Sequence, residues 1–222
     1  GFTWGMMNVS NVITTGEATT EYLKGIFPNL TAQQVQLGIP EIFKPSDKPK
    51  MPIVTIHTRE PRETMKIVKS FYVKFPQFKW ITFRDMRGLS REEFAKNLGE
   101  ACASIWVDRI SSFGTFPLES MMCNTPCIGT LPIMKPEWLT EENGIWVFDE
   151  SKVVEVIAGF LKNWLEDSVP VNLYEKMKKT TEIISEDKES KEVVNFFDTL
   201  FGEKSVEFDS AINKLTPVSE NS

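Results

Sequence analysis

Short apolar runs alternate with amphipathic segments of helical length along most of the chain. The apolar runs predict strands at residues 11–15, 34–37, 52–57, 79–83, 104–107, 126–130 and 145–148. The amphipathic segments predict helices at residues 17–26, 61–74, 152–166 and 189–201. Strands that alternate with helices favour a parallel sheet covered on both faces, so we expect a doubly wound α/β fold.

Two more helices are expected from their start signals. Ser90 and Glu93 have the spacing of a capping box, which predicts a helix running from there to about residue 101. Pro117 follows a loop at 108–114, and proline is tolerated in the first turn of a helix. A helix is therefore expected to begin near Pro117.

The proline-rich, polar segment 43–50 suggests a linker between structural units. On this basis residues 1–45 are a lead-in from a preceding domain, 46–186 are the ligand-binding α/β domain, and 187–222 are a C-terminal helix and polar tail. The sequence begins in mid-element at Gly1, so we expect it to be part of a longer protein.

Composition narrows the possible partners. The apolar fraction of 41% is enough for a real core, and a net charge of -6 argues against nucleic acid as a partner. No run of about 18 apolar residues indicates a transmembrane segment, and no secretory signal is evident. The three cysteines lack the spacing of a zinc site, so we expect free thiols, no bound metal and a cytoplasmic location.

A phosphate site is predicted where the loop at 108–114 meets the following helix. Backbone N–H groups of Gly114 and Thr115 can bind an anion there, since the positive end of the helix dipole faces it. Glu119 would lie in the first turn of this helix. It could accept hydrogen bonds from sugar hydroxyls, or it could only complement the helix dipole.

Residues 111–127, SSFGTFPLESMMCNTPC, resemble the donor-site signature of the retaining, family 4 class of GT-B glycosyltransferases. That signature has two glutamates eight positions apart around a Phe-Gly core. Glu119 matches the second glutamate, which binds the donor ribose in that family, whereas Ser111 stands where the first should be. Residues 37–45 are similar to the family's segment that leads from the first domain into the second, and residues 143–147 are similar to the Asn-Gly turn and strand that follow the donor site.

The resemblance implies a Rossmann-like doubly wound parallel sheet, the carboxy-terminal half of a GT-B architecture. It also implies that an arginine and a lysine grip the donor diphosphate without a metal. Arg59 suits the first role, and either Arg62 or Lys66 suits the second, although a solvated helix start is an alternative for Arg62.

The loop at 84–88 corresponds to the one that holds the nucleobase in that family. Met86 or Arg87 could stack on the base, or the loop could simply be solvated. His57, the only histidine, is expected to be structural, and Trp138 is expected to pack.

The implied activity is transfer of a hexose from a nucleotide-diphosphate sugar, most plausibly UDP- or GDP-linked, with retention. Arg59 and Glu119 would be the catalytic groups, and no cofactor beyond the donor substrate is expected. The acceptor would bind to a missing amino-terminal domain, so the isolated chain should be inactive. The alternative is a degenerate donor domain that binds a nucleotide or another protein without catalysis, for which Ser111 is the main argument. A flavodoxin-like module lacks support, because acidic residues do not follow the early strands.

Overall fold

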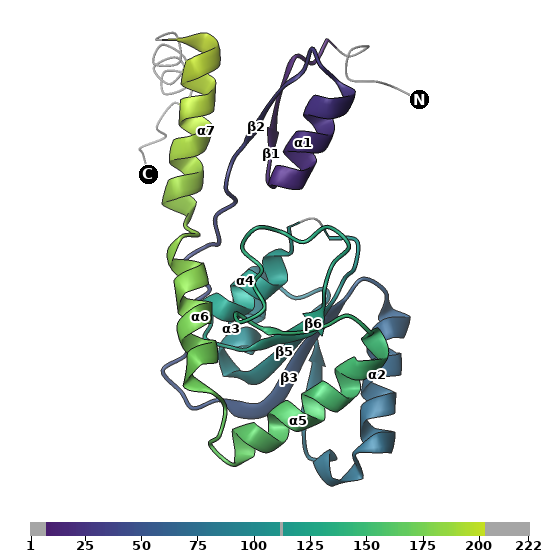
Figure 1. Ribbon diagram of the computed structural model, residues 1–222. Coiled ribbons are helices and arrows are strands. Elements are labelled where there is room, and N and C mark those ends of the chain that lie inside the picture. The colour runs from purple at the N-terminus through teal and green to yellow at the C-terminus, as the bar shows by residue number, and fades with distance from the viewer. Residues whose placement is uncertain (1–7, 112, 203–222) are drawn as a thin grey trace, which may run out of the picture.

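The computed structural model describes residues 8–111 and 113–202, which form two parallel sheets (Figure 1). The smaller sheet pairs β1 (Asn11–Thr14) with β2 (Thr31–Gln34). The larger one has five strands in the order β4-β3-β5-β6-β7, and every neighbouring pair runs parallel. The predicted doubly wound parallel sheet is confirmed.

The strands of the larger sheet are β3 (Met51–Thr58), β4 (Thr82–Asp85), β5 (Ala101–Val107), β6 (Cys127–Thr130) and β7 (Ile145–Val147). Two predicted strands were misplaced by about three residues. The strand expected at 79–83 is β4, because residues 76–78 form a 3₁₀ turn and Ile81 still lies before the strand. The strand expected at 34–37 is β2, whose sequence, Thr-Ala-Gln-Gln, is mostly polar.

The helices are α1 (Glu17–Ile26), α2 (Pro61–Lys74), α3 (Arg91–Glu100), α4 (Thr115–Met122), α5 (Val153–Leu165), α6 (Val171–Glu182) and α7 (Glu186–Phe201). The capping box at α3 is confirmed: Glu93 N donates to Ser90 Oγ at 3.2 Å and Ser90 N donates to Glu93 Oε2 at 3.1 Å. The helix α6 was missed, because it is largely polar and buries only Leu173, Met177 and Thr180.

Helices cover both faces of the five-stranded sheet (Figure 1). On one face α2 and α5 enclose a core that includes Phe71, Ile105 and Leu161. On the other face α3, α4 and α6 enclose a second core built around Trp106 and Leu118. The sheet is therefore buried on both sides, as parallel sheets require.

The segment 43–50 packs against the larger unit. Phe43 is 3% exposed and belongs to the second core. The ammonium of Lys50 donates to Gly99 O at 2.9 Å, to Cys123 O at 2.8 Å and to Thr125 Oγ1 at 2.6 Å. Lys50 thus ties the start of β3 to the ends of α3 and α4.

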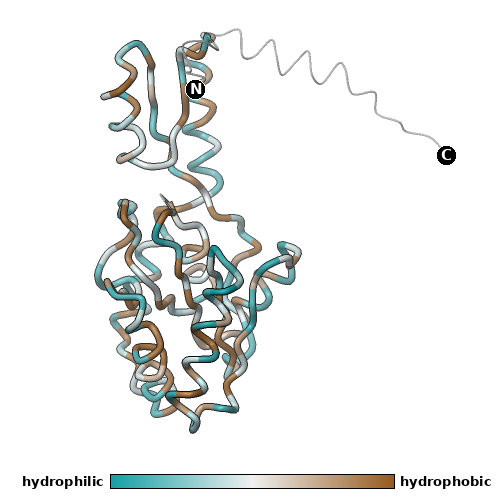
Figure 2. The backbone as a smooth tube through the Cα atoms, turned by 90° about the vertical axis from the view of Figure 1, so that its right-hand side faces the viewer, coloured by the Kyte–Doolittle hydropathy of each residue, from teal (hydrophilic) through white to brown (hydrophobic). Residues whose placement is uncertain are grey.

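The small sheet, α1 and α7 lie together at one end of the molecule, beyond the carboxyl ends of the strands of the larger sheet (Figures 1 and 2). Carboxylates of α7 accept backbone hydrogen bonds from the segment that follows β2: Gln36 N donates to Glu192 at 2.6 Å, and Gly38 N donates to Glu189 at 3.0 Å. Gly38 also lies directly against the backbone of Glu186. The segment that leaves the small sheet after β2 and the start of α7, which runs back toward that sheet, therefore lie side by side.

Candidate functional site

The order of the five strands reverses at β3. The chain passes from β3 through α2 to β4 on one side, then through α3 to β5 on the other side. The loops that follow β3 and β5 therefore diverge from neighbouring strand ends, where Thr58 pairs with Val107. Such a switch point is where open α/β sheets bind their ligands.

Asp108 organises the loop that follows β5. Its Oδ1 accepts hydrogen bonds from Ile110 N and Ser111 N, both at 3.1 Å. The same oxygen lies 3.5 Å from the Arg59 guanidinium on the loop that follows β3. Asp108 thus joins the two sides of the switch point.

Gly114 sets the direction in which α4 begins. As the N-cap residue it has φ 72° and ψ 75°, a left-handed conformation that favours glycine. A Cβ at this position would lie 2.8 Å from two ring atoms of Trp106, so no larger residue fits. Trp138 Nε1 donates to Phe113 O at 2.7 Å and holds the residue before it. Thr115 then begins the helix and is exposed.

Glu119 lies two residues further along α4 than expected. The helix begins at Thr115, two residues before Pro117, so Glu119 falls at the start of its second turn. The side chain is largely withdrawn from solvent, and this burial raises its pKa to about 7, opposed by the nearby Arg91. The carboxyl group of Glu119 therefore keeps its proton to a higher pH than an exposed glutamate does.

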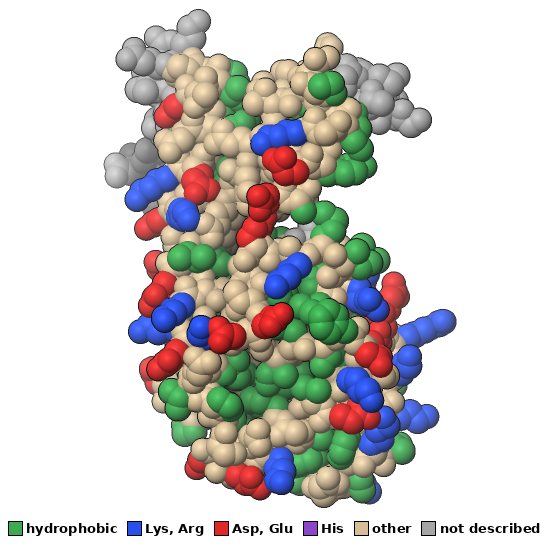
Figure 3. Space-filling view, viewed as in Figure 1, with side chains coloured by type: hydrophobic (Ala, Val, Ile, Leu, Met, Phe, Trp, Pro, Cys, Tyr) green, Lys and Arg blue, Asp and Glu red, His purple; other side chains and the backbone are tan. Residues whose placement is uncertain are grey.

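The three basic residues predicted to bind the diphosphate lie on two different elements, the loop after β3 and the helix α2. Arg59 is 55% exposed and stands at the switch point. Arg62 and Lys66 are exposed on α2, which follows β3 directly but covers the opposite face of the sheet from α4. On the face shown in Figure 3, acidic and basic side chains are interspersed, so a cationic site would be a local feature.

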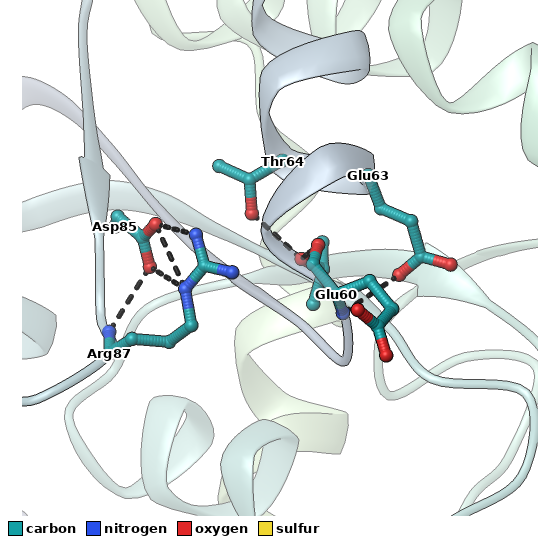
Figure 4. A network of polar contacts seen from close by, with 6 residues as sticks. Glu60, Glu63, Thr64, Asp85 and Arg87 are labelled. Atoms are coloured by element: carbon teal, nitrogen blue, oxygen red, sulfur yellow. Dashed lines mark hydrogen bonds and ion pairs between the residues drawn. The ribbon is translucent and has the colours of Figure 1, made fainter.

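The loop after β4 differs from the expectation for Met86. This side chain is 1% exposed and packs in the second core, so it is not available to stack on a base. The guanidinium of Arg87 is instead fixed by Asp85: Nε donates at 2.9 Å to Oδ1, and NH2 pairs with Oδ2. In Figure 4 this pair lies beside the start of α2, where Thr58, Glu60, Glu63 and Thr64 form their own hydrogen-bond network.

His57 is a packed residue. Its ring stacks on Phe116 with centroids 5.1 Å apart, and Phe94 contacts it edge-on. Burial lowers the pKa of His57, opposed by Asp108 and Asp85, so the ring is neutral at pH 7. This environment agrees with the structural role expected for it.

A hollow of about 220 Å³ lies between the loops of the larger unit and the small sheet. It is lined by Phe113, Glu137, Trp138 and Ile183 of the larger unit and by Thr15, Gln34 and Gln36 from the small sheet and the segment that follows it. Glu137 also accepts a hydrogen bond from the backbone of Glu17 at the start of α1. The two parts of the chain therefore meet directly beside the candidate site.

Within residues 8–111 and 113–202, no group of three or more His, Cys, Asp or Glu side chains is placed to hold a metal ion. No helix in the same ranges is both long and apolar enough to cross a bilayer.

Sequence reasoning missed Asp108 and Arg91. Asp108 carried a usable signal, because an aspartate directly after a buried strand often accepts backbone N–H groups two or three residues further on. Arg91 carried none, since its proximity to Glu119 depends on how α3 and α4 pack.

No protein-family model matches the sequence. The chain is 27% identical over 142 residues to an alpha-1,6-glucosyltransferase from Actinobacillus pleuropneumoniae serotype 7, a match covering 59% of this chain and 43% of that protein. In structure it is similar to the pneumococcal O-GlcNAc transferase GtfA in complex with UDP and GlcNAc, with a TM-score of 0.64 and 13% identity. That match covers 90% of this chain and 47% of GtfA.

A third similarity concerns a single domain. The C-terminal domain of a glycosyl transferase group 1 family protein (LpcC) from Francisella tularensis matches with a TM-score of 0.50 and 14% identity, over 64% of this chain and 97% of that domain. The chain thus spans less than half the length of the glucosyltransferase and of GtfA. Its structural neighbours are GT-B glycosyltransferases, which confirms the predicted fold.

Proposed function

We propose that this chain is the donor-binding half of a glycosyltransferase and that a nucleotide-diphosphate sugar binds at the switch point between β3 and β5. The proposal is carried by two features of the loops that follow β3 and β5: Gly114 turns the chain into α4 in a left-handed conformation, and Arg59 lies 3.5 Å from Asp108 at the switch point. A helix start beside a cation is a natural site for a diphosphate. The relatives support the same activity, since the glucosyltransferase and GtfA are transferases by name and GtfA is described with UDP.

Each residue of the site receives a role in this proposal. Backbone N–H groups at Gly114 and Thr115 bind the diphosphate, and Arg59 with Arg62 or Lys66 neutralises the charge that develops on it as the leaving group. Glu119 accepts hydrogen bonds from the ribose hydroxyls. Arg87, held by Asp85, contacts the nucleobase, for which uracil or guanine is proposed.

The transferred group is a hexose, and the anomeric configuration is retained. Acceptor binding requires a further, amino-terminal domain, so the 222-residue chain alone should bind the donor but transfer nothing. The three buried free cysteines accord with a reducing compartment, for which we propose the cytoplasm.

The experiment is a thermal-shift panel of UDP, GDP, ADP and CDP on the purified chain and on Glu119→Ala. A ligand at 100 times its dissociation constant adds about 2.7 kcal/mol, which is a rise in Tm of roughly 5 to 10 °C for a domain of this size. We expect one or two nucleotides to give this shift, and Glu119→Ala to abolish it. Glu175→Ala, an exposed glutamate on α6, is the matched control and should respond as the wild type does.

Absence of a shift with all four nucleotides in the wild-type chain would contradict the donor site. A shift that survives Glu119→Ala would keep nucleotide binding but remove the role given to that carboxylate.

A further inference from the structure

Asp108 carries three interactions on one oxygen. Its Oδ1 accepts from Ile110 N and Ser111 N and lies 3.5 Å from Arg59 NH1. The side chain is 20% exposed, against 55% for Arg59. A largely enclosed, multiply bonded carboxylate therefore faces a more exposed guanidinium.

Holding an arginine in this way has a direct effect on anion binding. An exposed arginine samples many rotamers, and fixing it costs up to about 2 kcal/mol of side-chain entropy when the anion arrives. A carboxylate that restricts the guanidinium beforehand reduces this loss, because the planar donor fork is already oriented. Arg59 NH1 lies 3.5 Å from Oδ1 of Asp108, the first residue of the loop that leads into α4. An Arg59 held by Asp108 therefore stays at the loop where the diphosphate is proposed to bind.

Asp108 also organises the loop that carries Ser111. Ser111 offers no carboxylate, and its backbone N–H is one of the two donors to Asp108. The carboxylate of this loop is therefore that of Asp108, which lies three residues before Ser111, directly after β5.

We propose that Asp108 is a positioning residue for the donor: through Oδ1 it fixes both the Arg59 guanidinium and the backbone of the 108–111 turn, and binding of a nucleoside diphosphate depends on that arrangement. This inference rests on the donor site proposed above. Asp108 need not touch the nucleotide, since it acts through Arg59.

A double-mutant cycle tests the proposal, with the dissociation constant of UDP measured by titration calorimetry on the 222-residue chain. The variants are Arg59→Ala, Asp108→Asn, Asp108→Ala and the combinations of each with Arg59→Ala. Asparagine keeps the oxygen that accepts from the two backbone donors and from Arg59 but removes its negative charge, so it isolates the contribution of the charge from that of the hydrogen bonds. Asp149→Ala is the matched control, because Asp149 likewise accepts from a loop backbone, Ser151 N at 2.9 Å, at the same edge of the sheet after β7.

We expect Asp108→Asn to weaken UDP binding about threefold and Asp108→Ala about tenfold, the scale of one charge-assisted hydrogen bond. In the Arg59→Ala background Asp108→Asn should have no further effect, since the group it positions is gone. Asp149→Ala should leave the affinity unchanged.

Four results would overturn the proposal. Asp108→Asn could bind UDP as tightly as the wild type, which would mean that the carboxylate only stabilises the loop. It could also bind UDP more tightly, which would mean that the carboxylate repels the diphosphate. Its effect could persist in the Arg59→Ala background, which would exclude action through Arg59. A wild-type chain that binds neither UDP nor GDP would remove the proposed function together with this inference; if it binds GDP alone, the same cycle is measured with GDP. The first three results leave the function intact.

Discussion

Glu119 combines burial with a position at the proposed ribose site. Burial raises its pKa from 4.5 to about 7, and the charge of Arg91 offsets only part of this shift. The unfolded chain exposes the same carboxyl to water, so the folded state holds the proton more tightly. Folding is therefore favoured when Glu119 is protonated and opposed when it is ionised.

This shift predicts a pH dependence of stability. The contribution of Glu119 is constant below pH 4.5, becomes unfavourable as the pH rises through the interval from 4.5 to 7, and is constant again above it. Across this interval the wild type should lose about 2 to 3 kcal/mol of unfolding free energy relative to Glu119→Gln, which does not titrate. Urea unfolding of both proteins at pH 4, 5, 6, 7 and 8 measures the difference. A difference that does not change with pH would show that the carboxyl is solvated.

At the scale of elements, the start of α4 depends on a glycine that is constrained twice. Gly114 has a positive φ, and a Cβ added there would lie 2.8 Å from the Trp106 ring. Gly88 has nearly the same φ of 73°, but a Cβ added there would have no heavy atom within 4 Å. The two glycines thus separate backbone strain from steric contact.

We expect Gly88→Ala to lower the unfolding free energy by about 1 kcal/mol, the cost of a left-handed alanine. Gly114→Ala should lose about 3 kcal/mol, because overpacking against a fixed indole adds to the same strain. Denaturant unfolding gives both values. Equal losses would mean that the Trp106 ring moves aside without cost.

The helices also show how far the sequence could predict the elements. Those with strong start signals were predicted closely, as at Ser90 and Pro61, because capping and the restricted φ of proline act locally. α6 was missed because its burial depends on contact with α4, and its sequence is mostly polar. The site shows the same limit: the signature predicts Gly114 and Glu119 as site residues, whereas the burial of Met86 and the approach of Arg59 to Asp108 depend on how loops from separate strands pack.

At the scale of the whole molecule, Gly38 allows the two parts of the chain to meet. A Cβ at Gly38 would lie 2.6 Å from Glu186 Cα and 2.7 Å from Ser185 O, and backbone atoms cannot turn aside as a side chain can. A Cβ added at Gly25, in α1, would have no heavy atom within 4 Å, so Gly25 serves as the control.

Gly38→Ala should separate α7 from the segment that follows β2. Hydrogen exchange at Gln36 and Gly38, whose amides donate to Glu192 and Glu189, should accelerate roughly 10- to 100-fold, since overpacking of 1 to 3 kcal/mol favours local opening. Gly25→Ala should leave these rates unchanged. Unaltered exchange in Gly38→Ala would mean that the two segments adjust without separating.

Because residues 36–38 lie against residues 185–186, the larger unit begins and ends at the same place in the structure. The chain therefore enters and leaves this unit at neighbouring positions, so the whole stretch from β3 to α6 could be replaced through two junctions that lie side by side. If the donor site proposed above is correct, replacing residues 40–184 by the matching stretch of a related enzyme should change the nucleotide preference, while the small sheet and α7 keep their fold.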